Sequence, residues 1–144
     1  MNRAAIDTNV LVTIIDSRDK WHPKATKLIE KLSTDKELQL VYFDCVLNET
    51  VSVLARRLEE QKRTQNFSTL LDDLQTHIPV DMITWISSDI KAVYKKVIAL
   101  VQQTSGTLNF HDALIALKCR DLKINSILRF DRDFDQIDWL RRIA

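Results

Sequence analysis

Four acidic residues stand out because each lies beside residues that should be buried. Asp7 ends a short apolar run near the N-terminus, and Asp131 follows the apolar run Ile124–Phe130. Glu49 interrupts a partly apolar helical face, and Asp112 begins a helix whose inward face is otherwise apolar. Burying a carboxylate that has no partner is costly, so a residue of this kind usually has a partner or a chemical task.

The elements that must position these acids alternate between strands and helices. Apolar runs predict strands at Arg3–Asp7, Leu38–Phe43, Met82–Ile86, Ile124–Phe130 and Trp139–Ile143. Helical spacing predicts helices at 9–15, at His22–Leu32, after an N-cap at Asp44, at Asn66–Ile78, from an N-cap at Ser87 or Ser88 to about 103, and at Asp112–Leu122. One glycine and two prolines give too few turn residues for an all-β chain, so we expect an α/β fold with a mainly parallel sheet.

In such a fold, acids from distant parts of the chain can meet. Asp7 and Asp131 stand at the carboxyl ends of two predicted strands, where the ligand crevice of an open α/β sheet lies. Carboxylates that converge without a counter-charge repel one another, and a divalent cation relieves the repulsion. A site made only of oxygen atoms suits Mg²⁺ or Mn²⁺ better than Zn²⁺. Such an ion activates water and stabilises charge on a phosphate, so the predicted chemistry is phosphodiester hydrolysis.

Each acid also has a purely structural interpretation. Asp7 could cap the helix that follows it, since Asp is a preferred N-cap residue. Asp112 lies three residues after Asn109, an arrangement similar to a capping box. Glu49 could pair with Arg56 or Lys62, and Asp131 could belong to a turn. It is the order and predicted position of the four acids together that favour a common site.

Composition limits the class of protein. A chain of 144 residues with 45% hydrophobic and 28% charged residues predicts a single globular domain spanning residues 1–144. The formal net charge of +1 does not by itself indicate a nucleic-acid partner. No signal peptide and no membrane-spanning run is recognised, and two isolated cysteines, Cys45 and Cys119, fit a reducing compartment. We therefore expect a cytoplasmic protein without a membrane partner.

Other side chains are more ambiguous. Clustered lysines and arginines usually form solvated helix faces, although a subset could line a path for RNA. Trp21, Trp85 and Trp139 could stack on bases, but packing is the commoner role and no function is assigned to them. His111 could assist proton transfer, and a place at the start of a helix explains it equally well.

Four stretches together resemble a known family. The segments AIDTNVLV, LNETVSVLARR, FHDALIALKCRD and ILRFDRDFDQI resemble the PIN domain, particularly the VapC-type toxin ribonucleases of toxin–antitoxin systems. The resemblance extends from Arg3 to about Ile137, and its most specific parts are the N-terminal Asp-Thr-Asn and the final Phe-Asp-Arg-Asp-Phe.

This resemblance implies a three-layer α/β/α sandwich around a mainly parallel sheet, and cleavage of RNA that depends on Mg²⁺ or Mn²⁺. The catalytic and metal-binding acids of the family fall on Asp7, Glu49, Asp112 and Asp131. Supporting positions fall on Thr8, on Asn9 beside the first acid, and on Asp133 behind the last. VapC-like proteins usually pair with a small antitoxin that enters the active-site groove, and they commonly form homodimers.

One position departs from the family pattern. PIN nucleases often carry Ser or Thr two residues before the last acid, where this chain has Arg129. An arginine there could contact an RNA phosphate, pair with Asp131, or indicate that the metal site has changed.

Two other motifs do not fit this chain. A calcium loop at DRDFD fails because its sixth position is Gln136 and its twelfth is Arg142. A phosphatase with a nucleophilic Asp7 would need a second Asp where Asn9 stands. The alternatives that stay open are a PIN-like module that binds RNA or protein with weak or no cleavage, a stand-alone RNA-processing nuclease, and a regulatory partner whose acids are only caps and surface charges.

Overall fold

A five-stranded parallel sheet forms the centre of the protein. The computed structural model describes residues 2–144. Its strands are β1 (Asn2–Ile6), β2 (Leu38–Phe43), β3 (Ile83–Thr84), β4 (Ser126–Leu128) and β5 (Arg141–Ile143), in the spatial order β3-β2-β1-β4-β5. Every neighbouring pair is parallel, and β1 pairs with β2 on one side and with β4 on the other. The α/β fold with a parallel sheet is thus confirmed.

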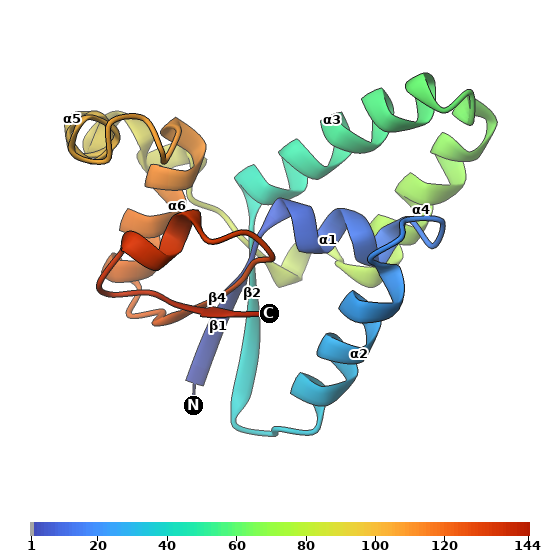
Figure 1. The fold of residues 1–144 in the computed structure, drawn as a ribbon, viewed down its shortest axis with the longest axis horizontal. Coiled ribbons are helices and arrows are strands. Elements are labelled where there is room, and N and C mark those ends of the chain that lie inside the picture. Colours follow the sequence, from blue (N-terminus) through green and yellow to red (C-terminus); the bar gives the residue numbers. More distant parts are fainter. Residues whose placement is uncertain (1) are drawn as a thin grey trace.

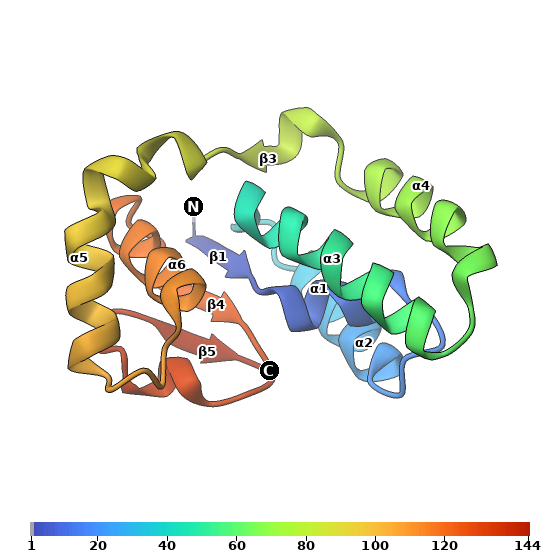
Figure 2. The same ribbon diagram turned by 90° about the horizontal axis from the view of Figure 1, so that it is seen from above.

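Helices connect the strands and cover the sheet. They are α1 (Thr8–Ile15), α2 (His22–Ser33), α3 (Asp44–Glu60), α4 (Phe67–His77), α5 (Ile90–Gln103) and α6 (Phe110–Asp121). In both ribbon views α5 and α6 lie together on one side of the sheet, with α1 to α4 grouped on the other (Figure 1, Figure 2). Among residues 2–144, no helix combines the length and apolarity needed to cross a membrane.

The core explains why the first strand is so apolar. Ala4, Ala5 and Ile6 of β1 are fully buried because the strand is central and has helices on both sides. A parallel strand covered on both faces reads as a continuous apolar run, with no alternation of polar residues. Ile127 of β4 pairs with Ala5 of β1 and is equally buried. Two segments from opposite ends of the sequence therefore form the middle of the sheet.

Several local predictions were wrong, and the first two concern the segment after α4 and the cap of α3, which Asp44 joins. The strand predicted at Met82–Ile86 is only two residues long, and the helix predicted from Ser87 begins with a 3-10 turn without a side-chain cap. Asp44 itself does not cap α3, because its carboxylate accepts hydrogen bonds from the backbone N–H groups of Ile86 (2.8 Å) and Ser87 (3.1 Å). Burial alone would raise the pKa of Asp44, but the bonds from Ser87 and Ile86 outweigh it and lower that pKa. The carboxylate thus holds the segment after β3 against the start of α3.

The third concerns β4, which is shorter than predicted because the chain leaves the ladder after Leu128. The backbone N–H of Arg129 still donates to the Ile143 carbonyl at 3.2 Å, so this residue remains tied to β5. Leu128 in turn accepts a hydrogen bond of 3.0 Å from the backbone N–H of Asp7. The ends of β1 and β4 are therefore fixed beside each other.

Candidate active site

Asp7 lies at the junction of β1 and α1. It occupies the N-cap position, yet its side chain makes no capping hydrogen bond. Only 4% of the residue is exposed. The interpretation of Asp7 as a helix cap is therefore wrong, and its carboxylate is available for other contacts.

Asp112 is placed by the start of α6. Asn109 caps this helix, since its side-chain oxygen accepts a hydrogen bond of 2.8 Å from the backbone N–H of Asp112. The cap is thus confirmed for Asn109, while the Asp112 carboxylate is left to face the edge of the sheet where Asp7 lies.

Asp131 follows β4 and is fixed by its neighbours. Asn9 donates from Nδ2 to Asp131 Oδ2 at 3.2 Å, and the backbone N–H of Asp133 donates to Asp131 Oδ1 at 3.1 Å. The turn interpretation of Asp131 is therefore partly right. Asn9 was expected to support Asp7, but in the structure its amide contacts the last acid and so links the start of α1 to the segment after β4.

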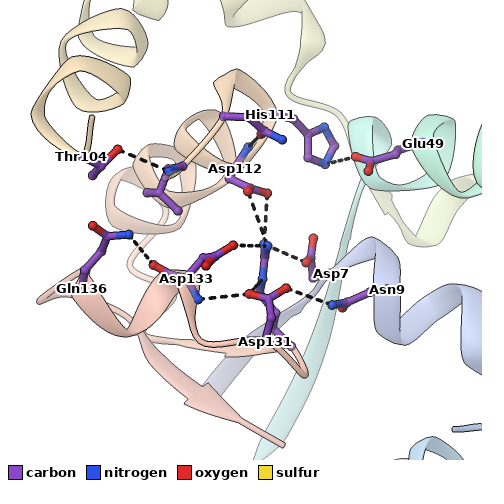
Figure 3. Close-up of polar contacts among 12 residues, drawn as sticks. Asp7, Asn9, Glu49, Thr104, His111, Asp112, Asp131, Asp133 and Gln136 are labelled. Atoms are coloured by element: carbon purple, nitrogen blue, oxygen red, sulfur yellow. Dashed lines mark hydrogen bonds and ion pairs between the residues drawn. The ribbon is translucent and has the colours of Figure 1, made fainter. Parts of the chain in front are cut away.

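Arg129 lies in the middle of these acids. Its Nη1 is 2.9 Å from Asp7 Oδ2 and 3.0 Å from Asp112 Oδ1. Its Nε donates to Asp131 Oδ1 at 2.6 Å, and its Nη2 is 3.7 Å from Asp133 Oδ2. Figure 3 shows Asp7, Asp112 and the two aspartates of the segment after β4, Asp131 and Asp133, with interactions converging between them. The residue that departs from the family pattern is thus the one that every acid of this cluster contacts.

The electrostatics of the cluster follow from burial and from this cation. Burial raises the pKa of Asp7 from 3.8 to about 6, although the charge of Arg129 acts in the opposite direction. Burial would also raise the pKa of Asp131, but the hydrogen bonds from Arg129 and from the backbone N–H of Asp133, together with the charge of Arg129, outweigh it and lower that pKa. Burial alone would lower the pKa of the Arg129 guanidinium. The hydrogen bond to Asp131 and the negative charge of Asp7 act against burial, so the pKa is raised and the guanidinium stays charged.

Glu49 stands apart from the cluster. It lies on α3, and its Oε2 is 2.7 Å from Nε2 of His111 at the start of α6 (Figure 3). The ion pair expected with Arg56 or Lys62 is absent from the described residues, where His111 is the partner. The structure therefore brings Asp7, Asp112 and Asp131 together and places Glu49 in a separate pair.

One open pocket of about 530 Å³ is nevertheless lined by all four predicted acids. Its wall also includes Trp21, Phe130 and Arg57, to which the sequence analysis assigned no role. The Trp21 residue is 47% exposed, its ring centroid is 6.1 Å from that of Phe130, and Lys24 Nζ is 5.2 Å from the Trp21 centroid. In the sequence, Trp21 is one of three tryptophans that could stack on bases, and Phe130 lies directly before Asp131, but their proximity to each other arises only in the folded structure.

By residue type, the pocket fits a divalent cation. Its donors are carboxylate oxygens, and the buried Thr8 Oγ1 and Asn9 Oδ1 have no hydrogen-bond partner. The arrangement does not yet fit, however, because no three His, Cys, Asp or Glu side chains of residues 2–144 are placed to hold one ion together. The guanidinium of Arg129 bonds to the oxygens that such an ion would use. These residues could hold a metal only in an arrangement in which Arg129 has moved aside.

Two solved structures have a similar fold. A chain of the VapBC2 structure from Rickettsia felis, bound to a DNA fragment from its promoter, aligns with 98% of this chain and 97% of its own length, at 17% identity and a TM-score of 0.69. VapC20 of Mycobacterium tuberculosis, described as a sarcin-ricin loop cleaving toxin, aligns over 94% of this chain and 95% of its own, at 17% identity and a TM-score of 0.68. No curated protein matches the chain.

The family itself is shown by the sequence. The model of the family described as PIN domain matches residues 4–140, which contain β2, β3, β4, the buried part of β1 and all the acids of the pocket. The fold of the two solved structures agrees with this match. The chain therefore belongs to the PIN domain family.

Proposed function

We propose that this PIN domain is an endoribonuclease that hydrolyses RNA phosphodiester bonds with the help of Mg²⁺ or Mn²⁺. The observation that carries the proposal is the meeting of Asp7, Asp112 and Asp131 at the carboxyl edge of a parallel sheet, in an open pocket with Glu49 on its wall. PIN domains are typically nucleases, and membership of the family supports the same reaction.

Hydrolysis of a phosphodiester requires a deprotonated water and stabilisation of the negative charge on the phosphate. A divalent cation, held by carboxylate oxygens of Asp7, Asp112 and Asp131, would supply both. Glu49 and His111 lie side by side, with Glu49 Oε2 2.7 Å from His111 Nε2, and a proton acceptor can be drawn from this pair. Trp21 and Phe130 provide an aromatic wall for a base, and Lys24 is the cation nearest to it, suited to a neighbouring phosphate.

We further propose that the protein is the toxin of a toxin–antitoxin pair, with a small antitoxin that covers this pocket and with a homodimer as its assembly. The similarity in fold to a VapBC2 chain and to the VapC20 toxin supports this assignment. A short reading frame of antitoxin type next to the gene is the simplest supporting observation. Its absence would favour a stand-alone RNA-processing nuclease.

A second candidate is a PIN domain that binds RNA or protein and cleaves weakly or not at all. The observation that favours it is Arg129, whose guanidinium bonds to the carboxylates that a catalytic ion would need. Both candidates use the same pocket, and they differ in whether bound RNA is cut.

The deciding experiment measures cleavage of a mixed RNA pool by the wild type and by Asp7→Asn and Asp112→Asn at equal folded concentration. We expect cleavage in Mn²⁺ that EDTA abolishes, and a loss of about a hundredfold or more in each variant. Asp72→Asn, on the exposed face of α4, is the matched control and should keep full activity. Equal cleavage by the wild type and Asp7→Asn would overturn the role of Asp7, and binding without cleavage across several metals and RNAs would favour the second candidate.

A further inference from the structure

We infer that Arg129 is an internal cation that competes with a divalent metal for Asp7, Asp112 and Asp131, so that the metal site of this PIN domain forms only when the guanidinium withdraws. The inference rests on the proposed function in one respect, since it takes these acids as the metal ligands. It gives a role to Arg129, which stands at a position where PIN nucleases often carry Ser or Thr.

The contacts of Arg129 are too numerous for an incidental ion pair. Its side chain is 7% exposed and bonds to Asp7, Asp112 and Asp131 at distances between 2.6 and 3.0 Å. The guanidinium carbon also lies 4.5 Å from the ring centroid of Phe134, which is itself buried. An arginine with several planar donors satisfies acids on several sides at once, and a buried arginine is retained where such acids need a counter-charge.

The same contacts show why the two cations exclude each other. Nη1 alone contacts one oxygen of Asp7 and one of Asp112, and Nε occupies an oxygen of Asp131. A hard divalent ion needs oxygens at about 2.0 to 2.6 Å, so it cannot share these carboxylates with a positive group already at hydrogen-bond distance. Like charges at such a separation also repel strongly in a pocket that is partly closed to water. Binding of the metal therefore requires that Nη1 leave Asp7 and Asp112.

The structure also provides a place for the guanidinium after it withdraws. The side chains of Asp131 and Asp133 are 42% and 46% exposed, whereas those of Asp7 and Asp112 are 6% and 11% exposed. Arg129 already contacts both exposed acids. It can remain beside Asp133 while the ion takes Asp131 and the two inner carboxylates, which otherwise would be left buried without a counter-charge. The exchange replaces the single positive charge of the guanidinium with the two positive charges of the divalent ion beside Asp7 and Asp112.

The test is the affinity of the protein for Mn²⁺ alone, measured by titration calorimetry and by the electron paramagnetic resonance signal of free Mn²⁺, without RNA. We expect Arg129→Thr to bind Mn²⁺ about tenfold or more tightly than the wild type, because the competing cation is gone. Arg120→Thr is the matched control: Arg120 is exposed, lies over the Trp139 ring and does not line the pocket, so its loss should leave the affinity unchanged. The double variant Asp7→Asn/Arg129→Thr should lose the gained affinity. Equal Mn²⁺ affinity in the wild type and Arg129→Thr would overturn the inference.

Loss of Arg129 also removes the counter-charge of buried acids, so the variant's folding must be followed. If Arg129→Thr unfolds without metal, we expect Mn²⁺ to restore its thermal transition, since an ion that binds only the native state stabilises it. If it stays unfolded in Mn²⁺, Arg129→Lys decides, because a lysine keeps the charge but loses the planar donors. Tighter Mn²⁺ binding by Arg129→Lys than by the wild type supports the competition, and unchanged binding contradicts it.

These results separate the inference from the proposed function. Tighter Mn²⁺ binding by Arg129→Thr without RNA cleavage by any variant would uphold the competition and reject the nuclease. Metal-dependent cleavage that needs Asp7, together with unchanged Mn²⁺ affinity in Arg129→Thr, would uphold the nuclease and reject the competition.

Discussion

The raised pKa of Asp7 predicts an unusual dependence of stability on pH in the metal-free protein. Burial moves the pKa of this carboxyl from 3.8 to about 6 in the folded state. Between these two values the folded protein keeps the Asp7 proton while the unfolded chain has lost it. Stability linked to Asp7 is therefore fully present below the ordinary pKa, and it is lost as the pH rises through about 6.

The magnitude follows from the size of the change. One pKa unit corresponds to about 1.36 kcal/mol, so ionising Asp7 in the native state costs about 3 kcal/mol. Asparagine at this position cannot ionise. The free energy of unfolding of Asp7→Asn, minus that of the wild type, should thus rise by about 3 kcal/mol between pH about 4 and pH about 7.

Urea unfolding followed by tryptophan fluorescence, in EDTA and at constant ionic strength, measures this difference. Taking the difference between variant and wild type cancels the titration of groups that both proteins share. Asp72→Asn is again the control, and its difference from the wild type should stay flat because the residue is exposed. If the Asp7→Asn difference also stays constant within about 0.5 kcal/mol across this range, the argument from burial is refuted.

Three further predictions concern residues outside the acidic cluster. Asp44→Ala should lower the free energy of unfolding by about 1 to 3 kcal/mol in urea titrations, because buried N–H groups after β3 lose their acceptor; a change near zero would contradict that role. Trp21→Ala should weaken binding of single-stranded RNA, measured by fluorescence anisotropy, by about 1 to 3 kcal/mol, whereas Trp85→Ala, exposed and outside the pocket, should not. Burial raises the pKa of the Cys45 thiol to about 12 and also raises that of Cys119. Both thiols in the folded protein should therefore react far more slowly with a thiol reagent at neutral pH than in the denatured chain. Equal rates would contradict the burial of these thiols.

Residues whose environment is set by their own segment could be predicted from the sequence. Asp7 follows a continuous apolar run, and such a run in an α/β chain is a central parallel strand whose end opens on the ligand crevice. Asn109 and the start of α6 were likewise predictable, because an N-cap bond joins residues three positions apart.

Residues whose partners come from distant segments could not be predicted in the same way. The sequence marks Arg129 as a departure from the family pattern, but its contacts with Asp7 and Asp112 arise only when β1, α6 and the end of β4 are packed together. The same holds for Glu49, whose partner His111 lies on a different helix and not on its own. Asp44 has the local pattern of an N-cap, yet it bonds to a segment more than forty residues away.

The pairing of β1 with β4 has a consequence for how the protein comes into being. Ala5 pairs with Ile127, so the central strand gains its second neighbour only when residues 126–128 have been made and have reached the sheet. Contacts between such distant segments form late and slowly during folding. A growing polypeptide that has not reached residue 131 carries Asp7 and Glu49 but no complete acidic pocket. During biosynthesis the molecule therefore lacks the complete acidic pocket until its C-terminal segment has joined the sheet.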